Sequence, residues 1–380
     1  MYDVAVVGAG PAGASAAMAA AREGARVLLL DRHDFPRDKP CGDGITPQAL
    51  FELEKLGVSN LDDGYPALPD LSLTSPSGIR ARRPMRVPVR VIPRSVFDSR
   101  LVRAAVAAGV ELRKHRVRRI SEENDRVVID DIEARTLIGA DGAMSVVRRH
   151  LGEAPNGSGH LAIAIRGYAQ QPPKDGLLQR IVMSQGPWPA YAWSFPIGDG
   201  RRNVGYGELL RAAPISRDHL LGRLTKLIPD VDLGETDNLR AHHLPLSTQR
   251  PVPGRGRILL AGDALSLINP FTGEGIFYAV VSGGLAGQTA ALLPTSDAAQ
   301  RYRLALRKRL HRHLRHTSMA TRLARVPGVV DAGIRAGAGE QKVFNAFVEL
   351  GLGDGLITSR LLRKTFGQLV LRRSGRKQDR

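Results

Sequence analysis

Residues 2–31 read YDVAVVGAGPAGASAAMAAAREGARVLLLD, and this stretch decides the fold. The apolar run 4–7 predicts a buried strand, and the alanine-rich stretch that follows predicts a helix up to about Glu23. The run 26–30 predicts a second strand, which ends at Asp31. Strand, helix and strand in this order are typical of the first βαβ unit of a doubly wound α/β domain.

The turn between the first strand and the helix has the spacing Gly8-x-Gly10-x-x-Gly13. In dinucleotide-binding units the first glycine makes the tight turn, the second lets the backbone approach a pyrophosphate, and the third lets helix and strand pack closely. The N–H groups at the start of the helix favour phosphate, and a carboxylate about twenty residues further on can accept ribose hydroxyls. The predicted dinucleotide contacts of this unit are Gly8, Gly10, Ala12, Gly13, Asp31 and Arg32.

The composition indicates a large globular protein. The chain has 380 residues, of which 43% are hydrophobic, and this length exceeds the size at which a single core usually stops growing, so two or more domains are expected. The single cysteine, Cys41, excludes an intramolecular disulfide, which fits a reducing cytoplasm. The N-terminus lacks the features of a secretory signal, and no apolar run reaches the roughly 18 to 20 residues of a membrane span. We therefore expect a cytoplasmic protein that is at most peripheral to a membrane.

The chain is strongly basic. It has 55 lysines and arginines against 37 acidic residues, which gives a formal net charge of +18. Nucleic acid, an anionic membrane or a phosphate-bearing small molecule could each account for this excess, as could the base composition of the genome. The sequence contains no helix-turn-helix, zinc-finger or RNA-binding signature, so a nucleic-acid partner is not expected. We also expect no bound metal.

Two later segments each place an acidic residue and glycines after an apolar strand. Residues 137–149 read LIGADGAMSVVRR, in which the strand ends at Asp141, and residues 257–276 read RILLAGDALSLINPFTGEGI, in which the strand ends just before Asp263. A helix that starts near Glu274 points the positive end of its dipole at any anion in front of it. A reduced flavin carries negative charge near its pyrimidine edge, so such a helix would favour the reduced form.

Together with the N-terminal glycine turn, these segments resemble the FAD-binding pattern of the flavin monooxygenase and geranylgeranyl reductase superfamily. The resemblance implies FAD as the cofactor, with Asp263 near its ribityl and pyrophosphate groups. It also implies that Arg94, at the start of a predicted helix, lies near the FAD, whereas the alternative is a solvated arginine. The FAD contacts implied by these segments are Arg94, Asp141, Gly262, Asp263, Gly273, Gly275 and Ile276.

The only cysteine lies within residues 35–50, which read FPRDKPCGDGITPQAL. This stretch closely resembles the P-R-x-K-x-C-G-x-G-x-x-P segment of geranylgeranyl reductases, flavoenzymes that saturate isoprenoid double bonds. In that family the cysteine lies beside the flavin, which implies a catalytic role for Cys41. A thiol near a ring can pack, donate weakly or ionise, and the alternative is an inert buried thiol.

A second signature of the same family lies at residues 191–207, which read YAWSFPIGDGRRNVGYG. It matches the pattern Y-x-W-x-F-P followed by G-x-G, which in these reductases lines the cavity for the polyprenyl chain. Because side chains alternate along a strand, Tyr191, Trp193 and Phe195 lie on one face and can form one wall. The resemblance implies that they contact a hydrophobic, prenylated substrate, and the alternative is that they belong to an ordinary core.

The order of predicted strands and helices divides the chain into three regions. We expect an α/β fold with a Rossmann-type FAD-binding domain, an inserted antiparallel β-sheet domain that binds substrate, and a C-terminal basic helical region. The FAD-binding domain is assigned to 1–70, 94–158 and 256–295, the substrate domain to 71–93 and 159–255, and the helical region to 296–380. Further local predictions are a three-stranded meander at 115–140 and helices near 216–228, 298–325 and 355–373.

Within the basic helical region, apolar residues recur every four positions at Tyr302, Leu306, Leu310 and Leu314. This spacing forms one apolar stripe on a helix whose other faces carry arginines. The stripe either lies on an anionic membrane, with the arginines on the lipid headgroups, or packs on the core of the protein itself.

The resemblance implies one of two oxidoreductase functions. The first is the reduction of carbon-carbon double bonds in a polyprenyl substrate, in which reduced FAD gives a hydride to one carbon and Cys41, or a water that it orients, gives a proton to the other. The alternative is an FAD-dependent monooxygenase that hydroxylates or epoxidises an aromatic or olefinic metabolite. NADPH or ferredoxin is the expected electron donor.

Overall fold

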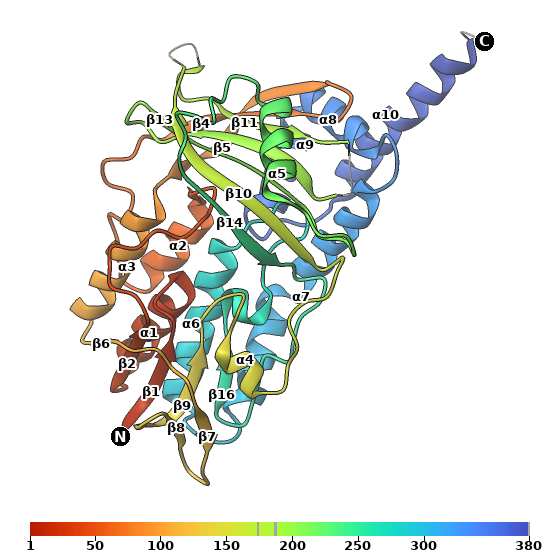
Figure 1. The fold of residues 1–380 in the computed structure, drawn as a ribbon. Coiled ribbons are helices and arrows are strands. Elements are labelled where there is room, and N and C mark those ends of the chain that lie inside the picture. The colour runs from red at the N-terminus through yellow and green to blue at the C-terminus, as the bar shows by residue number, and fades with distance from the viewer. Residues whose placement is uncertain (173–174, 186–187, 379–380) are drawn as a thin grey trace.

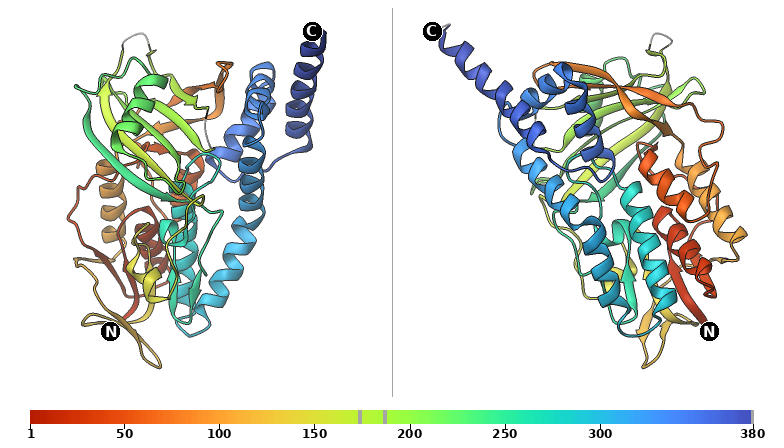
Figure 2. Two further views of the ribbon diagram at one scale, coloured as in Figure 1. Left: turned by 45° about the vertical axis from the view of Figure 1, so that its right-hand side comes forward. Right: turned by 180° about the vertical axis from the view of Figure 1, so that it is seen from behind.

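The computed structural model describes residues 1–172, 175–185 and 188–378, with side chains up to Val370. In this part of the chain the strands form two eight-stranded sheets. The C-terminal helices run along one side of both sheets, and the last helix ends away from the body of the molecule (Figures 1 and 2).

The first sheet contains the predicted βαβ unit. Its strands are β1 (Tyr2–Val7), β2 (Val27–Asp31), β6 (Glu111–Lys114), β7 (Ile120–Glu122), β8 (Val127–Ile129), β9 (Ile132–Gly139), β15 (Gly254–Arg255) and β16 (Ile258–Leu260). The strand order is β15-β16-β9-β1-β2-β6, and β7 and β8 extend the sheet as a meander from β9. Strands β16, β9, β1, β2 and β6 run parallel, as a doubly wound α/β domain requires.

Helices cover the first sheet and bring their N-termini to one end of it. They are α1 (Pro11–Arg22), α2 (Pro47–Lys55), α3 (Arg94–Ala107), α4 (Val146–His150) and α6 (Ile276–Leu292). Helices α1 and α6 pack with their backbones in contact, because a Cβ on Gly283 would come within 2.1 Å of the carbonyl oxygen of Ala12. The first residues of both helices line the same cavity.

The second sheet lies above the end of the first (Figure 1). Its strands are β3 (Gly44–Ile45), β4 (Leu68–Thr74), β5 (Arg80–Val91), β10 (Leu161–Gln170), β11 (Gln179–Met183), β12 (Ala190–Pro196), β13 (Arg201–Leu209) and β14 (Asp237–Pro245). The order is β14-β10-β13-β12-β11-β4-β5-β3, and only the β11–β4 pair of these described strands is parallel. Helix α5 (Arg217–Leu227) packs Leu220 and Leu224 against one face of this sheet.

Four helices form the C-terminal part of the described chain. They are α7 (Ala298–Ala324), α8 (Val329–Gly339), α9 (Gln341–Leu352) and α10 (Ser359–Gln378). The predicted apolar stripe of α7 is buried in the core of the first sheet, and the Tyr302 hydroxyl donates a hydrogen bond to the Leu260 carbonyl at 2.9 Å. The stripe therefore packs on the protein itself and is not free to enter a membrane. Among the described residues, no helix is both long enough and apolar enough to cross a membrane.

The α/β fold class is confirmed, and so are the main local predictions. The meander predicted at 115–140 is β7 to β9, the helix predicted near 216–228 is α5, and the two basic helices are α7 and α10. The assignment of chain segments to separate domains stays a prediction. Strand β3 lies in the segment assigned to the FAD-binding domain but pairs with β5, so the loop that carries Cys41 joins the two sheets.

Candidate active site

The glycine turn between β1 and α1 leaves no room for a side chain at Gly8 or Gly13. Gly8 has a φ of +99°, and a Cβ at this position would lie 2.4 Å from the Ala140 carbonyl oxygen. A Cβ on Gly13 would lie 1.7 Å from the Gly8 carbonyl oxygen. Helix α1 begins without a side-chain cap at Gly10, which lines the cavity. The first N–H groups of the helix are thus available to an anion, as a pyrophosphate site requires.

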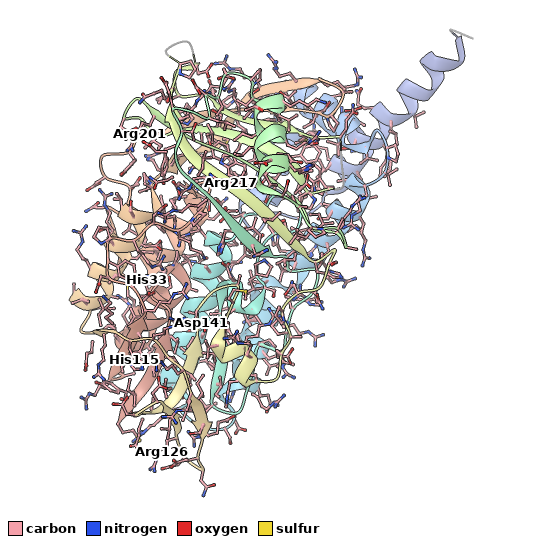
Figure 3. All side chains as sticks on the ribbon, in the orientation of Figure 1. His33, His115, Arg126, Asp141, Arg201 and Arg217 are labelled. Carbon is pink, nitrogen blue, oxygen red and sulfur yellow. The ribbon has the colours of Figure 1, made fainter. Side chains whose placement is uncertain are left out.

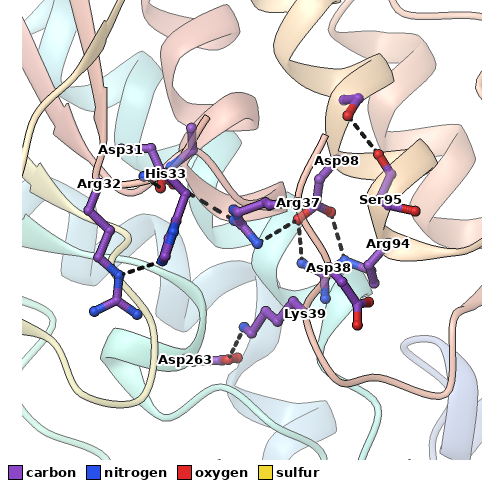
Figure 4. Close-up of polar contacts among 12 residues, drawn as sticks. Asp31, Arg32, His33, Arg37, Asp38, Lys39, Arg94, Ser95, Asp98 and Asp263 are labelled. Atoms are coloured by element: carbon purple, nitrogen blue, oxygen red, sulfur yellow. Dashed lines mark hydrogen bonds and ion pairs between the residues drawn. The ribbon is translucent and has the colours of Figure 1, made fainter. Parts of the chain in front are cut away.

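Charged side chains surround this turn (Figure 4). The Asp31 carboxylate accepts a hydrogen bond from the Ala9 N–H at 2.8 Å. Arg37 lies between two carboxylates, 3.7 Å from Asp31 and 3.3 Å from Asp98. Arg94 is buried, and its guanidinium donates two hydrogen bonds to Asp98 at 2.6 and 2.8 Å. The alternative of a solvated arginine at this helix start is therefore wrong.

A second charged pair lies at the start of α6. Lys39 donates a hydrogen bond to Asp263 at 2.9 Å (Figure 4). Burial raises the pKa of Asp263, but Lys39, together with His242 and Arg94, outweighs this effect and holds the pKa below its usual range. Next to it, the Glu274 carboxylate accepts a hydrogen bond from the Phe277 N–H at 2.9 Å, and burial raises the pKa of Glu274 to about 7. The cavity thus places an ionised Asp263 near a carboxyl that holds its proton close to neutral pH.

The loop around Cys41 is fixed to the second sheet by a buried polar network. The Cys41 carbonyl accepts hydrogen bonds from the side chains of Asn203 at 2.8 Å and Arg166 at 3.2 Å. The Asp43 carboxylate accepts from Asn203 at 2.8 Å and from the Tyr168 hydroxyl at 2.6 Å. Burial raises the pKa of Asp43 to about 6, although Arg166 and these hydrogen bonds oppose the shift. This network determines where the backbone of Cys41 lies.

Cys41 lines the cavity, and its thiol is held in the neutral form. Burial raises the pKa of the thiol, and the nearby Arg94 only partly offsets this effect. The next residue packs against the aromatic wall, because a Cβ on Gly42 would lie 3.4 Å from the Phe195 ring. The Cys41 loop and the aromatic strand therefore form adjoining parts of one cavity.

Tyr191, Trp193 and Phe195 lie on the same side of β12, as predicted, and all three line the cavity. The ring centroids are 6.0 Å apart for Tyr191 and Trp193 and 6.5 Å apart for Trp193 and Phe195. The Trp193 indole N–H donates to the Asn203 side-chain oxygen at 2.8 Å, and the Tyr191 hydroxyl donates to the Thr272 carbonyl. These hydrogen bonds hold two of the rings in place beside the cavity.

Beyond the aromatic strand the same cavity becomes almost entirely apolar. It continues between the second sheet and the C-terminal helices. The sheet contributes residues such as Leu71, Met85 and Met183, and helices α7 to α10 contribute residues such as Leu323, Ile334 and Phe366. The cavity therefore connects the polar glycine turn at one end with a long apolar region at the other.

Comparisons with known proteins agree with this geometry. Residues 1–167 match the family model described as an FAD binding domain. The chain is 33% identical over 353 residues to menaquinone reductase of Mycolicibacterium smegmatis, covering 85% of this chain and 83% of the relative. It is 34% identical over 309 residues to digeranylgeranylglycerophospholipid reductase 1 of Methanopyrus kandleri, covering 76% of this chain and 80% of the relative.

The chain belongs to the geranylgeranyl reductase family of FAD-dependent oxidoreductases. A crystal structure of a geranylgeranyl bacteriochlorophyll reductase-like protein from Thermoplasma acidophilum has the same fold. Its TM-score is 0.78 at 21% identity, over 96% of this chain and 95% of that chain. The Thermoplasma acidophilum protein and this chain thus share one fold over nearly their whole lengths.

The residues around the glycine turn fit the FAD of this family. The turn excludes side chains at Gly8 and Gly13, which leaves the backbone open to a bulky anion. Arg37 lies beside it, with one terminal nitrogen 3.5 Å from where a Cβ of Gly10 would be. The Nε atom of Arg37 is buried without a hydrogen-bond partner in the described structure. A phosphate oxygen would supply such a partner.

The structure brings most of the predicted site residues to the cavity. Those that line it are Gly10, Ala12, Cys41, Arg94, Tyr191, Trp193, Phe195, Asp263, Gly273, Gly275 and Ile276. The tight turns and close packing behind the cavity involve Gly8, Gly13 and Gly262. Asp31 holds the first of these turns by accepting a hydrogen bond from the Ala9 N–H.

Asp141 and Arg32 are placed differently. The Asp141 carboxylate accepts hydrogen bonds from the Ser145 hydroxyl and, at 2.6 Å, from the Val146 N–H, so it stabilises the start of α4 (Figure 3). Arg32 is exposed and donates to His33 at 3.0 Å. Neither side chain is among the residues that line the cavity, and their contact with FAD stays a prediction.

Several residues at the cavity were not singled out by the sequence. Lys39, Arg166, His242 and Glu274 line the cavity. Arg37, Asp43 and Asn203 lie behind it, beside the glycine turn or the Cys41 loop. Arg37 and Lys39 lie within the cysteine motif and could have been found there, and Glu274 lies in the glycine turn before α6. Arg166 and Asn203 come from β10 and β13, and no local pattern marks their contact with Cys41.

Proposed function

We propose that this enzyme reduces carbon-carbon double bonds in a polyprenyl substrate, with electrons that pass through FAD. The observation that carries the proposal is the single cavity, which runs from the glycine turn past Cys41 into an apolar region walled by helices. A long prenyl chain needs such a region because its transfer out of water is favourable only where apolar surface surrounds it. The relatives at 33% and 34% identity are named reductases of menaquinone and of a digeranylgeranyl phospholipid.

In this proposal the cofactor lies along the polar part of the cavity. The N–H groups at the start of α1, near Gly10 and Ala12, would hold the pyrophosphate, and Asp31 would bind on the adenosine side. Asp263, fixed by Lys39, would hold the ribityl chain, and the first backbone N–H groups of α6, at Gly275 and Ile276, would bind the ring. When bound, FAD in its reduced form supplies a hydride to one carbon of the double bond.

The side chains of the cavity position the alkene and supply the proton. The rings of Tyr191, Trp193 and Phe195 exclude water and hold the prenyl chain flat against one wall. The Cys41 thiol keeps its proton because burial raises its pKa, so Sγ–H can protonate the second carbon. The bonds from Asn203 and Arg166 to the Cys41 carbonyl keep this thiol in place.

NADPH or ferredoxin is proposed as the electron donor, and the cytoplasm, with contact to a membrane, as the location.

The monooxygenase alternative shares the fold. The reductase names of both relatives favour the first function, and so does the agreement of the Cys41 segment and the β12 aromatics with the reductase pattern.

Product analysis tests the proposed reaction. The purified enzyme is given a geranylgeranyl compound that carries no quinone and a chemical reductant, with and without oxygen, and the mass of the product is measured by mass spectrometry. A reductase adds the mass of one hydrogen molecule for each saturated bond and does so without oxygen. A product that gains an oxygen atom, and forms only in air, would support the monooxygenase instead.

A further inference from the structure

The apolar part of the cavity reaches the surface of the molecule at α10. Phe366 lines the cavity and is also 42% exposed. On the other side, at the end of α7, Leu323 lines the cavity and is only partly buried. The wall that would hold an apolar ligand is therefore continuous with the outer surface at these two helices.

Two apolar groups lead outward from this edge. On α10, Leu362, Phe366 and Val370 are spaced by four residues and share one side of the helix, and Val370 is 62% exposed. The second apolar group consists of Met319 and Leu323, which are four residues apart on α7, and Val326, which follows the end of this helix. Met319 is 40% exposed and Val326 is 47% exposed. We call these six residues the docking face: Met319, Leu323, Val326, Leu362, Phe366 and Val370.

The docking face is flanked by positive charge. The part of α10 whose side chains the structure describes, residues 359–370, contains Arg360, Arg363 and Lys364 and no acidic residue. Three exposed arginines form no ion pair with any described residue: Arg322 on α7, Arg325 directly after the end of α7, and Arg363 on α10. The acidic Glu340 nearby is already paired with Arg360 and Lys364. The surroundings of the docking face are therefore strongly cationic.

We propose that the docking face lies on an anionic lipid bilayer, with the apolar groups among the acyl chains and the arginines on the headgroups. Apolar area and lysine or arginine side chains together give interfacial binding to anionic lipid. A symmetric dimer through this face would bring the cations of two copies together, which disfavours a second copy as the occupant. The docking does not depend on the proposed reaction. The further step, in which a prenyl chain enters the cavity from the bilayer, does rest on the proposed reaction.

Vesicle co-sedimentation of the full chain tests this proposal. The protein is mixed with vesicles of phosphatidylcholine alone, or with vesicles in which part of the phosphatidylcholine is replaced by phosphatidylglycerol. No substrate or reductant is present. We expect sedimentation with the anionic vesicles at low salt, little with the neutral ones, and release as salt rises, because screening shortens the reach of each charge.

Matched variants locate the contact. The charge pair Arg322→Glu with Arg363→Glu, and the apolar pair Phe366→Ser with Val370→Ser, should each reduce the vesicle-bound fraction by roughly tenfold or more. The control pair, Arg118→Glu with Arg119→Glu, changes the net charge by the same amount at exposed positions beside β7 and should bind like the wild type. FAD content and thermal unfolding confirm that each variant is folded.

The proposal would be overturned if the chain stayed in the supernatant with anionic vesicles at low salt. It would also be overturned if the charge pair and the apolar pair both bound vesicles like the wild type, or if the control pair lost binding to the same extent. Sedimentation without vesicles that disappears in the docking-face variants would instead assign the face to self-association. A chain that docks but reduces no prenyl compound would contradict only the proposed reaction.

Discussion

The side chain of Asn203 donates a hydrogen bond to the carbonyl of Cys41 at 2.8 Å and so ties the cysteine loop to the second sheet. The same side chain donates to Asp43 and accepts from the Trp193 indole. Asn203→Ala would leave buried polar groups without partners, so the free energy of unfolding should fall by about 1 to 3 kcal/mol. Urea unfolding measures this free energy. As a control, Asn124→Ala at an exposed position should change the free energy of unfolding by no more than about 0.5 kcal/mol. Equal stability of wild type and Asn203→Ala would show that the network does not stabilise the loop.

The raised pKa of Asp43, about 6, predicts a pH dependence of stability. The folded protein holds the proton of Asp43 more tightly than the unfolded chain, so stability falls as pH rises from about 4 to about 6. Asp43→Asn removes this titration and keeps a residue that tolerates the φ of +58°. Between these pH values the wild type should lose on the order of 1 to 3 kcal/mol relative to the variant. Parallel stability curves for the two proteins would rule out a raised pKa.

Two glycines of the first turn should behave differently when replaced by alanine. Gly10 has a φ of −76° and room for a Cβ, so Gly10→Ala should fold but bind FAD at least about tenfold more weakly, because the backbone approaches the pyrophosphate there. Gly13→Ala should lose the fold of the β1–α1 unit, because its Cβ would overlap the Gly8 carbonyl. Circular dichroism and FAD titration separate the two effects. A Gly10→Ala variant with normal FAD affinity would contradict the assigned pyrophosphate site.

Cys41→Ser should keep the fold and the FAD, since the change is nearly isosteric. The rate of alkene reduction should fall by an order of magnitude or more, and each factor of ten corresponds to roughly 1.4 kcal/mol of barrier. Single-turnover mixing of the reduced variant with a prenyl compound gives this rate directly. Full activity would assign Cys41 to packing.

Local patterns in the sequence predicted the elements that depend on neighbours in the chain. The glycine turn, the strands on both sides of α1 and the alternation of Tyr191, Trp193 and Phe195 follow from spacing within about thirty residues. The stripe at Tyr302 was also visible, but spacing alone does not say whether such a stripe faces lipid or core. Burial in the first sheet decided between them.

Contacts between distant segments were not predictable. Asn203 lies 162 positions from Cys41, and nothing near either residue marks the hydrogen bond between them. The C-terminal helices were expected as a basic appendage, but they form the far wall of the cavity. Which apolar residues enclose a cavity depends on how whole elements pack, and spacing does not record that.

Anaerobic reoxidation of the reduced enzyme tests the central claim most directly. The protein is photoreduced without oxygen and mixed with a geranylgeranyl compound that carries no quinone, and the flavin absorbance is followed in a stopped-flow instrument. The account predicts that the oxidised flavin spectrum returns at a rate that rises with the prenyl compound and that a saturated analogue has no effect. A flavin that stays reduced until oxygen is admitted, whatever prenyl compound is present, would contradict the account.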